Sequence, residues 1–255
     1  MLANSLVRGH DPLLPPFQID MKPVAIFRHI AHEGPGYLAE FLDAHKIPWQ
    51  LIDSTTDNLA LLRVSDYSGL VFMGGPMSVN DDLPWIAPTL ALIRDAFAKD
   101  VPLLGHCLGG QLISKALGGV ISANPIKEIG WGEVNVSNND IARNWFGDMQ
   151  NFHAFHWHGE TFTLPQGATH LLSSPYCTNQ AYAIGKHLAL QCHPEMTTTM
   201  IAEWCEAGAS EITASKSVAV QSVDAMQQQM EVSLPQLNNV AHRLYSRWIK
   251  GLKQS

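Results

Sequence analysis

The chain has 255 residues, of which 46% are hydrophobic and only 15% are charged, and its formal net charge is −7. This length and apolar content suit a large core in one domain of the α/β kind, whereas the acidic balance disfavours a nucleic-acid partner, whose phosphates need a basic face. A membrane span is disfavoured as well, because no stretch approaches roughly 18 consecutive apolar residues.

Residues 1–21 precede the first apolar run, and we expect them to form an N-terminal extension. They lack the order of a signal peptide, which has a basic start, a long apolar run and a small-residue cleavage site. The four cysteines show neither CxxC pairing nor the spacing of a disulfide framework. We therefore expect a cytoplasmic protein with reduced thiols, in which residues 22–255 form a single domain.

Apolar runs alternate with segments of helical periodicity in the first half of the chain. The expected strands are residues 24–28, 49–52, 69–73 and 101–104, and the expected helices are residues 34–45, 85–99 and 112–117. Strands that alternate with helices predict an α/β fold with three layers, α/β/α, and a mostly parallel central sheet covered on both faces.

The second half of the chain has a different character. Residues 120–191 contain shorter apolar runs and turns, which predict an antiparallel extension of the sheet. From about residue 197 we expect C-terminal helices, with an apolar stripe at three- and four-residue steps between Leu234 and Trp248. The Ser- and Gln-rich residues 207–229 are less amphipathic, and we interpret them as a mobile helical insertion.

A cysteine lies between an expected strand and an expected helix, in residues 105–111 (GHCLGGQ). Glycines two residues before and two after Cys107 predict a very sharp turn that presents this side chain at the carboxyl edge of the sheet. The same turn places it at a helix N-terminus, whose partial positive charge favours a thiolate. Cys107 is therefore a candidate nucleophile, and the alternative is a buried structural cysteine in a glycine-rich turn.

A candidate base follows the last apolar run of the expected sheet. A thiolate nucleophile works with a base that a third group orients. His193 and Glu195 lie two residues apart around Pro194, so their side chains are expected to point the same way, with Glu195 holding one ring nitrogen of His193. Such a tripeptide is often only a surface turn, and its position downstream of the cysteine turn is what favours a catalytic role.

Glycines also end the expected strand over residues 69–73. Attack on an amide carbonyl generates an oxyanion, which needs preorganised backbone N–H donors. Gly74 and Gly75, followed by Pro76, allow the backbone to come that close, although a plain tight turn has the same residues.

These three motifs resemble, in their nature and order, those of the class I glutamine amidotransferases. The nucleophile segment matches the family pattern G-x-C-x-G-x-Q, and the resemblance runs from about residue 24 to residue 195. Residues 127–131 (KEIGW) and 157–162 (WHGETF), with residues 164–168 and 179–181, are most similar to stand-alone proteins related to the glutaminase part of GMP synthase. The resemblance implies a flavodoxin-like fold.

The resemblance also implies roles for individual residues. Cys107 would be the nucleophile, His193 the general base and acid, and Glu195 the residue that orients His193. The backbone N–H groups of Gly75 and Leu108 would form the oxyanion hole.

The substrate would be glutamine or another small γ-glutamyl molecule. Gln111 and Gly74 would contact it, and His158 would line the pocket. The reaction would release ammonia and leave a γ-glutamyl thioester, which water then hydrolyses.

Two positions depart from the family pattern. His106 stands where a small or apolar residue is usual, and we interpret it as a packing residue that could instead perturb the thiol. Cys192 stands where an aromatic is common, and we expect a small buried side chain whose oxidation could affect the site.

Three histidines, His153, His156 and His158, form the pattern H-x-x-H-x-H, which a zinc site would use. We predict no metal and no cofactor, because no nearby cysteine or acidic residue completes the set convincingly and alternate residues of a strand need not converge.

The leading functional hypothesis is a glutaminase of the amidotransferase kind. The chain has no phosphate-binding loop of the G-x-x-x-x-G-K-[ST] kind, so any ammonia acceptor chemistry would lie on a separate synthetase subunit, or there is none. A γ-glutamyl peptidase or small-amide hydrolase would use the same triad. A non-catalytic binding or regulatory module is the alternative of another class.

Overall fold

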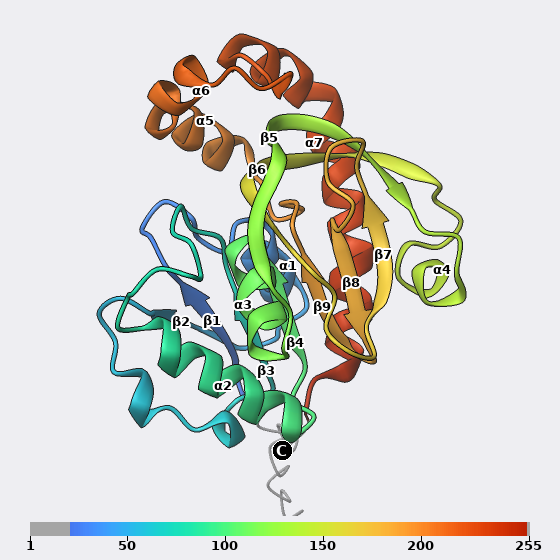
Figure 1. Cartoon of the computed structure of the whole chain (residues 1–255). Helices are drawn as coiled ribbons and strands as arrows, with labels where there is room; N and C mark the ends of the chain where they lie inside the picture. Colours follow the sequence, from blue (N-terminus) through green and yellow to red (C-terminus); the bar gives the residue numbers. More distant parts are fainter. Residues whose placement is uncertain (1–20, 254–255) are drawn as a thin grey trace, which may run out of the picture.

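A sheet of ten strands lies between two layers of helices in the computed structural model, which describes residues 21–253 (Figure 1). Nine strands follow the order β10-β5-β7-β8-β9-β4-β3-β1-β2, and β6 pairs with β5 outside this path. The three-layer α/β/α fold expected from the sequence is confirmed.

The parallel half of the sheet contains five strands that share one direction. In sheet order they are β2 (Trp49–Asp53), β1 (Val24–Arg28), β3 (Gly69–Phe72), β4 (Leu103–His106) and β9 (His187–Leu190). Strands β3, β4 and β9 are buried along their whole length, as helices on both faces require, which explains why they read as continuous apolar runs.

The expected antiparallel extension is confirmed on the far side of β9. It consists of β8 (Ala181–Ile184), β7 (Thr169–Ser173), β5 (Ile121–Val136) and β6 (Asn151–Phe162). Strands β5 and β6 form the longest pairing, with α4 (Asp140–Phe146) in the connection between them. A register shift between Ala123 and Glu128 bends this pair beside the pocket described below.

Each face of the sheet has its own hydrophobic core. Alternate residues of β1 divide between the two, so that Val24 and Ile26 lie in one core and Ala25 and Phe27 in the other. Helices α1 (Tyr37–Ala44) and α7 (Val223–Trp248) cover the first face, and α2 (Ile86–Ala98) and α3 (Leu108–Ala116) cover the second.

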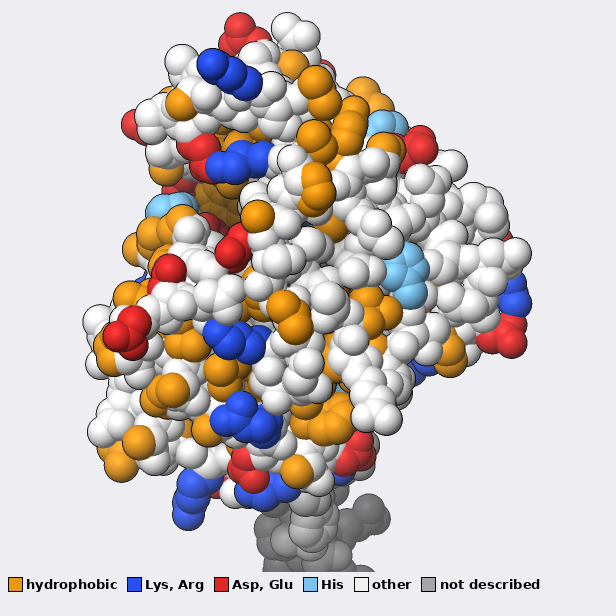
Figure 2. Space-filling view, viewed as in Figure 1, with side chains coloured by type: hydrophobic (Ala, Val, Ile, Leu, Met, Phe, Trp, Pro, Cys, Tyr) orange, Lys and Arg blue, Asp and Glu red, His pale blue; other side chains and the backbone are white. Residues whose placement is uncertain are grey.

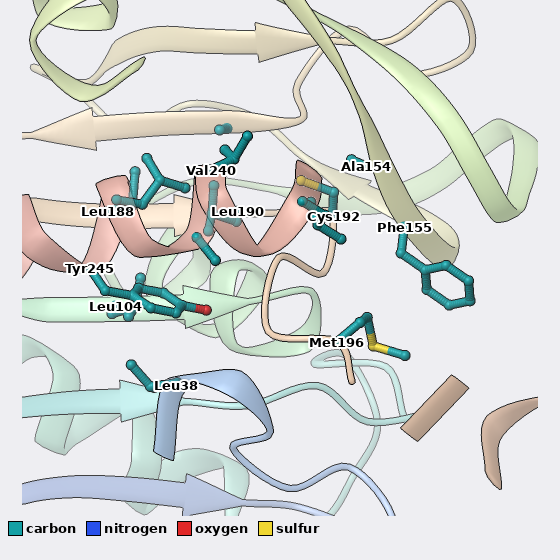
Figure 3. Close-up of a cluster of buried hydrophobic side chains, with 14 of the residues drawn as sticks. Leu38, Leu104, Ala154, Phe155, Leu188, Leu190, Cys192, Met196, Val240 and Tyr245 are labelled. Atoms are coloured by element: carbon teal, nitrogen blue, oxygen red, sulfur yellow. The ribbon is translucent and has the colours of Figure 1, made fainter. Parts of the chain in front are cut away.

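Figure 3 shows part of the core between the sheet and α7. Leu104 of β4 and Leu188 and Leu190 of β9 face Val240 and Tyr245 of the helix. The apolar stripe predicted between Leu234 and Trp248 is therefore the buried face of α7.

The C-terminal region differs from the expected helical insertion over residues 207–229. Two short helices, α5 (Thr198–Ala207) and α6 (Ala209–Ala214), are followed by an extended segment whose strand β10 (Ala219–Val220) pairs in parallel with β5. The Gln221 side-chain oxygen accepts a hydrogen bond from the Trp131 backbone N–H at 2.8 Å, and the Gln221 backbone N–H donates to the Ile129 carbonyl oxygen. These hydrogen bonds to β5 hold the segment extended. Their partners lie about 90 residues earlier in the chain, so local sequence does not reveal them.

Several element ends differ by a few residues from those expected. The helix expected from residue 34 begins at Tyr37, because Pro35 and Gly36, with φ 47° at Gly36, form a turn before it. Three short 3₁₀ helices, Leu59–Leu61, Val64–Asp66 and Ile249–Gly251, were not expected. Residues 1–20 of the expected extension lie outside the described residues. Within the described range, no helix has both the length and the apolar character needed to cross a membrane.

Candidate active site

A pocket of about 510 Å³ lies at the carboxyl ends of the parallel strands. Three residues of its wall lie in the segments that follow these strands. They are Glu33 after β1, Gly75 after β3 and Cys107 after β4. Trp204 of α5 and Glu211 of α6 form the opposite wall. In Figure 2 the hollow lies between the α5–α6 region, at the top of the view, and the body of the molecule. Ligands of open α/β sheets bind at this edge.

Cys107 occupies the sharp turn that the glycine pattern predicted. It ends β4 and caps α3 with φ 49°, a backbone conformation that non-glycine residues rarely adopt. A Cβ on Gly105 would lie 2.5 Å from the carbonyl carbon of Gly109, so the strand and helix can approach this closely only without side chains. Cys107 is 5% exposed and lies at the N-terminus of the nine-residue helix α3.

Two polar groups besides His193 lie near the Cys107 sulfur. Gln191 Nε2 donates a hydrogen bond to Sγ at 3.4 Å, and Sγ lies 3.8 Å from the carbonyl oxygen of Trp157. Gln111 Nε2 in turn donates to Gln191 Oε1 at 3.2 Å. Gln111, which the sequence predicts to contact substrate, therefore lines the pocket and also connects to the sulfur through Gln191.

His193 and Glu195 form a buried pair beside this sulfur. His193 Nδ1 lies 2.8 Å from Glu195 Oε1, and each side chain is 1% exposed. His193 Nε2 is buried without a hydrogen-bond partner, so this nitrogen is free to serve the thiol. The edge of the His193 ring meets the Trp204 ring with centroids 4.8 Å apart, which holds the ring in place.

The charges of this pair are coupled. Burial by itself would lower the pKa of His193, but the negative charges of Glu195 and Cys107 outweigh it and raise this pKa well above 6.5. Burial likewise opposes ionisation of Glu195, yet the neighbouring His106 and His193 lower the pKa of Glu195 below its ordinary value. The arrangement therefore favours a carboxylate at Glu195 beside an imidazolium at His193.

The two expected oxyanion donors lie next to each other. A Cβ on Gly75 would lie 2.7 Å from a side-chain methyl carbon of Leu108, so the two residues are in contact. Neither N–H donates to another backbone group within the described chain, which leaves both available for a ligand oxygen. Of the two glycines, Gly75 lines the pocket, while Gly74 lies against the Glu33 carboxyl and the ring of His193.

His158 lines the pocket and belongs to a network of buried polar groups. Its Nε2 lies 3.1 Å from Glu128 Oε2, and its Nδ1 lies 3.0 Å from the Glu160 carbonyl oxygen. Gln180 and Ser174 also donate to Glu128, at 2.9 and 2.8 Å. These contacts give the His158 ring a single orientation.

Metal ligation is the other reading of this cluster. Glu128, His158 and Cys177 have the spacing of metal ligands, but the donor atoms of Glu128 and His158 already hydrogen-bond to each other and to their neighbours. Among the described residues, His158 groups with these two and not with His153 or His156. The absence of a metal remains a prediction.

The two residues that depart from the family pattern are both buried. Cys192 is 1% exposed within the core of the α7 face, as expected, and burial raises its pKa. His106 is completely buried, with Nε2 3.1 Å from the hydroxyl of Tyr245 and 3.9 Å from Glu195 Oε2. The interpretation of His106 as a packing residue therefore omitted two polar neighbours.

Sequence reasoning did not single out Glu33. This half-buried carboxyl lines the pocket. Burial raises its pKa to about 7, with Glu195 adding to the shift and His193 opposing it. Its position just after the first strand was a signal, because the carboxyl ends of parallel strands meet at the ligand-binding edge.

An ion pair at the pocket wall was missed as well. Lys127 Nζ lies 2.5 Å from Glu211 Oε1, and Trp157 Nε1 donates to Glu211 Oε2 at 2.9 Å. All three residues line the pocket. Lys127 and Trp157 lie in segments that carry the family resemblance, whereas Glu211 lies in the region interpreted as an insertion.

Known proteins resemble this chain in sequence and in fold. The profile of the family described as "Glutamine amidotransferase class-I" matches residues 38–205. A crystal structure of a glutamine amido transferase from Methylobacillus flagellatus superposes with a TM-score of 0.89 and 42% identity, over 92% of this chain and 97% of that one.

The curated relatives are less similar in sequence than that crystal structure, and each matches a smaller part of the chain. GMP synthase [glutamine-hydrolyzing] of Acinetobacter baylyi is 31% identical over 142 residues, which are 54% of this chain and 25% of that protein. Gamma-glutamyl peptidase 3 of Arabidopsis thaliana is 29% identical over 144 residues, which are 54% of this chain and 58% of that protein. The chain therefore spans about a quarter of the first relative and little more than half of the second.

Proposed function

Because the chain belongs to the class I glutamine amidotransferase family, we propose that it hydrolyses the side-chain amide of glutamine, with Cys107 as nucleophile and His193 and Glu195 as its partners. The observation that carries this proposal is the buried contact of 2.8 Å between His193 and Glu195 beside a cysteine at a strand–helix turn. A base that is oriented by a third group is what a thiol nucleophile needs.

In the first half of the reaction His193 takes the thiol proton, and the sulfur attacks the amide carbon. The carbonyl oxygen becomes an oxyanion, which the N–H groups of Gly75 and Leu108 stabilise. When the C–N bond breaks, His193 gives the proton to the departing nitrogen, which leaves as ammonia. The product on the enzyme is a γ-glutamyl thioester of Cys107.

In the second half water replaces ammonia. His193 accepts a proton from the water, whose oxygen attacks the thioester carbon. The C–S bond breaks to release glutamate, and His193 returns the proton to the Cys107 sulfur. Glu195 stays ionised and supports the imidazolium at each step, in agreement with its lowered pKa. The sum is one glutamine and one water converted to one glutamate and one ammonia.

Substrate contacts are assigned to the pocket wall around Cys107. Gln111 would bind the α-amino and carboxylate end of glutamine, and Gly74 and His158 would shape the same part of the site. The support for Gln111 is its position in the lining and its connection to the sulfur through Gln191. The ordered ring of His158 suits a residue that defines pocket shape.

A second candidate is hydrolysis of a γ-glutamyl peptide or a similar small amide by the same triad. The volume of about 510 Å³ favours it, because such a pocket accepts ligands of drug size, larger than free glutamine. The similarity to a plant γ-glutamyl peptidase points the same way.

If ammonia is passed to an acceptor, a separate synthetase subunit would carry out that step. The similarity to a bacterial GMP synthase [glutamine-hydrolyzing] supports a role in supplying ammonia to an acceptor. A binding or regulatory module without turnover is the alternative of another class, and the pairing of His193 with Glu195 argues against it.

The experiment measures ammonia and glutamate release from glutamine and from a panel of γ-glutamyl dipeptides, by the whole chain and by Cys107→Ala. Cys177→Ala is the matched control, because this thiol is also buried but lies outside the triad. Release from glutamine that is lost only in Cys107→Ala would support the glutaminase, and cleavage of the dipeptides alone would favour the peptidase. No turnover of any substrate would contradict both.

A further inference from the structure

A second histidine lies behind the catalytic carboxyl. His106 is the last residue of β4, directly before Cys107, and its side chain is completely buried. His106 Nε2 lies 3.1 Å from the hydroxyl of Tyr245 and 3.9 Å from Glu195 Oε2. Figure 3 shows Tyr245 lying beside Leu104, with its hydroxyl directed along β4 towards the end of that strand.

The two oxygens of Glu195 have unequal surroundings. Oε1 contacts His193, whereas Oε2 is buried and has no hydrogen-bond partner. A buried carboxylate oxygen without a donor is costly, so a nearby N–H strongly affects the orientation of the group. His106 Nε2 is the nitrogen that faces this oxygen.

We propose that His106 and Tyr245 are positioning residues, which hold the Glu195 carboxylate so that its Oε1 stays directed at His193. The negative charge of Glu195 favours the His106 tautomer with its proton on Nε2, because that nitrogen faces the carboxylate. The Nε2–H group then points towards both Oε2 of Glu195 and the hydroxyl oxygen of Tyr245. This inference rests on the proposed function.

Tyr245 can hold His106 because it is itself immobilised. Its side chain is completely buried in the core of the α7 face. Its ring packs against the Phe41 ring in an edge-to-face arrangement, with the ring centroids 5.6 Å apart. Tyr245 belongs to α7, which lies beyond the residues matched by the family profile, 38–205. The C-terminal helix would thereby contribute to the geometry of the triad.

The test compares His106→Leu, which removes the N–H, with His106→Gln, whose amide nitrogen can reach about the same place. We expect His106→Leu to lower kcat for glutamine about tenfold with little change in KM, because Glu195 Oε2 then loses the one N–H that faces it at 3.9 Å and the carboxylate is held less firmly. His106→Gln should recover most of kcat. A packing residue would not show this rescue, so equal kcat values in the two variants would overturn the proposal.

Tyr245→Phe should lower kcat about threefold, since it removes only the hydroxyl that holds His106. Its matched control is Tyr182→Phe, because Tyr182 is also buried but lies in the core on the opposite face of the sheet. Equal effects of the two substitutions on kcat would contradict the role of Tyr245.

A readout without turnover separates this inference from the proposed function. In protein labelled with ¹⁵N-histidine, the Nδ1–H proton of His193 should give a low-field NMR signal because of its bond to Glu195. We expect His106→Leu to shift or broaden it and His106→Gln to preserve it. A folded His106→Leu with an unchanged signal overturns the positioning role, even if the wild-type chain turns over no substrate, which would contradict only the proposed function.

Discussion

Nδ1 of His193 lies 2.8 Å from Oε1 of Glu195, and both side chains are buried to within 1% of their surface. The contact selects the tautomer in which Nε2 can accept a proton, and it supports the imidazolium when Nε2 does so. The first prediction follows from it.

Glu195→Gln should lower kcat for glutamine by about 10²–10⁴, because the amide can hold the ring in the wrong tautomer and carries no charge. The measurement is steady-state ammonia release. Glu203→Gln is the matched control, since Glu203 is exposed on α5, and it should leave kcat unchanged. A Glu195→Gln variant with kcat near the wild-type value would contradict the role of Glu195.

Glu33 leads to a prediction about stability and pH. Its carboxyl has a folded-state pKa of about 7 against an ordinary value of 4.5, so the folded state disfavours its ionisation. Below pH 4.5 the carboxyl is protonated in both the folded and the unfolded state, so it does not change the free energy of unfolding. As the pH rises from 4.5 through about 7, ionisation favours the unfolded state and the folded state loses stability. A glutamine side chain at position 33 cannot ionise, so the Glu33→Gln variant does not lose stability in this way.

Glu33→Gln should therefore match the wild-type Tm at pH 4.5 and exceed it by about 2–4 °C at pH 8. Thermal unfolding followed by circular dichroism at several pH values gives the comparison. Glu40→Gln, at an exposed position of α1, should show no such pH-dependent difference. A constant Tm difference across this pH range would contradict the raised pKa of Glu33.

Lys127 should distinguish the two candidate substrates. It lies at the pocket wall, where its ammonium pairs with Glu211 and can meet the carboxylate of an amino-acid leaving group. Lys127→Ala should raise KM for γ-glutamyl dipeptides about tenfold, the worth of a charge-assisted hydrogen bond, and change KM for glutamine little, because ammonia carries no carboxylate. Lys99→Ala, at an exposed ion pair, serves as the control. Equal effects on both substrates would rule out this contact.

Gly109 should not accept a side chain. A Cβ there would collide with the Phe72 carbonyl group, across the contact between α3 and β3. Gly109→Ala should lower the free energy of unfolding by about 1–3 kcal/mol, as overpacking does in other cores. Urea unfolding measures the change. Gly34→Ala is the control, because a Cβ at Gly34 meets nothing within 4 Å. Similar losses in both variants would show that the cause is not this collision.

The order of the elements was predictable because each carries its own pattern. Apolar runs such as residues 69–73 are buried on both faces, so a continuous run indicates a parallel strand without knowledge of its partners. The stripe of α7 was readable for the same reason, since its spacing matches the helical repeat. The register of β10 on β5 was not readable, because a two-residue strand has no periodicity of its own.

The sequence by itself determined the candidate nucleophile and its base, because each lies in a short motif whose shape depends on adjacent residues. Glycines on both sides of Cys107 imply the sharp turn, and His193 and Glu195 are close enough in the chain for one turn to bring them together.

Only the tertiary structure decided which groups surround these residues. Tyr245 lies 139 residues from His106 in the chain, and Glu211 lies 84 residues from Lys127, yet each pair is in contact. Such contacts depend on how α6 and α7 pack against the sheet, and no local pattern of residues encodes that packing. Burial is decided there as well, and burial is the main cause that raises the pKa of Glu33 to about 7.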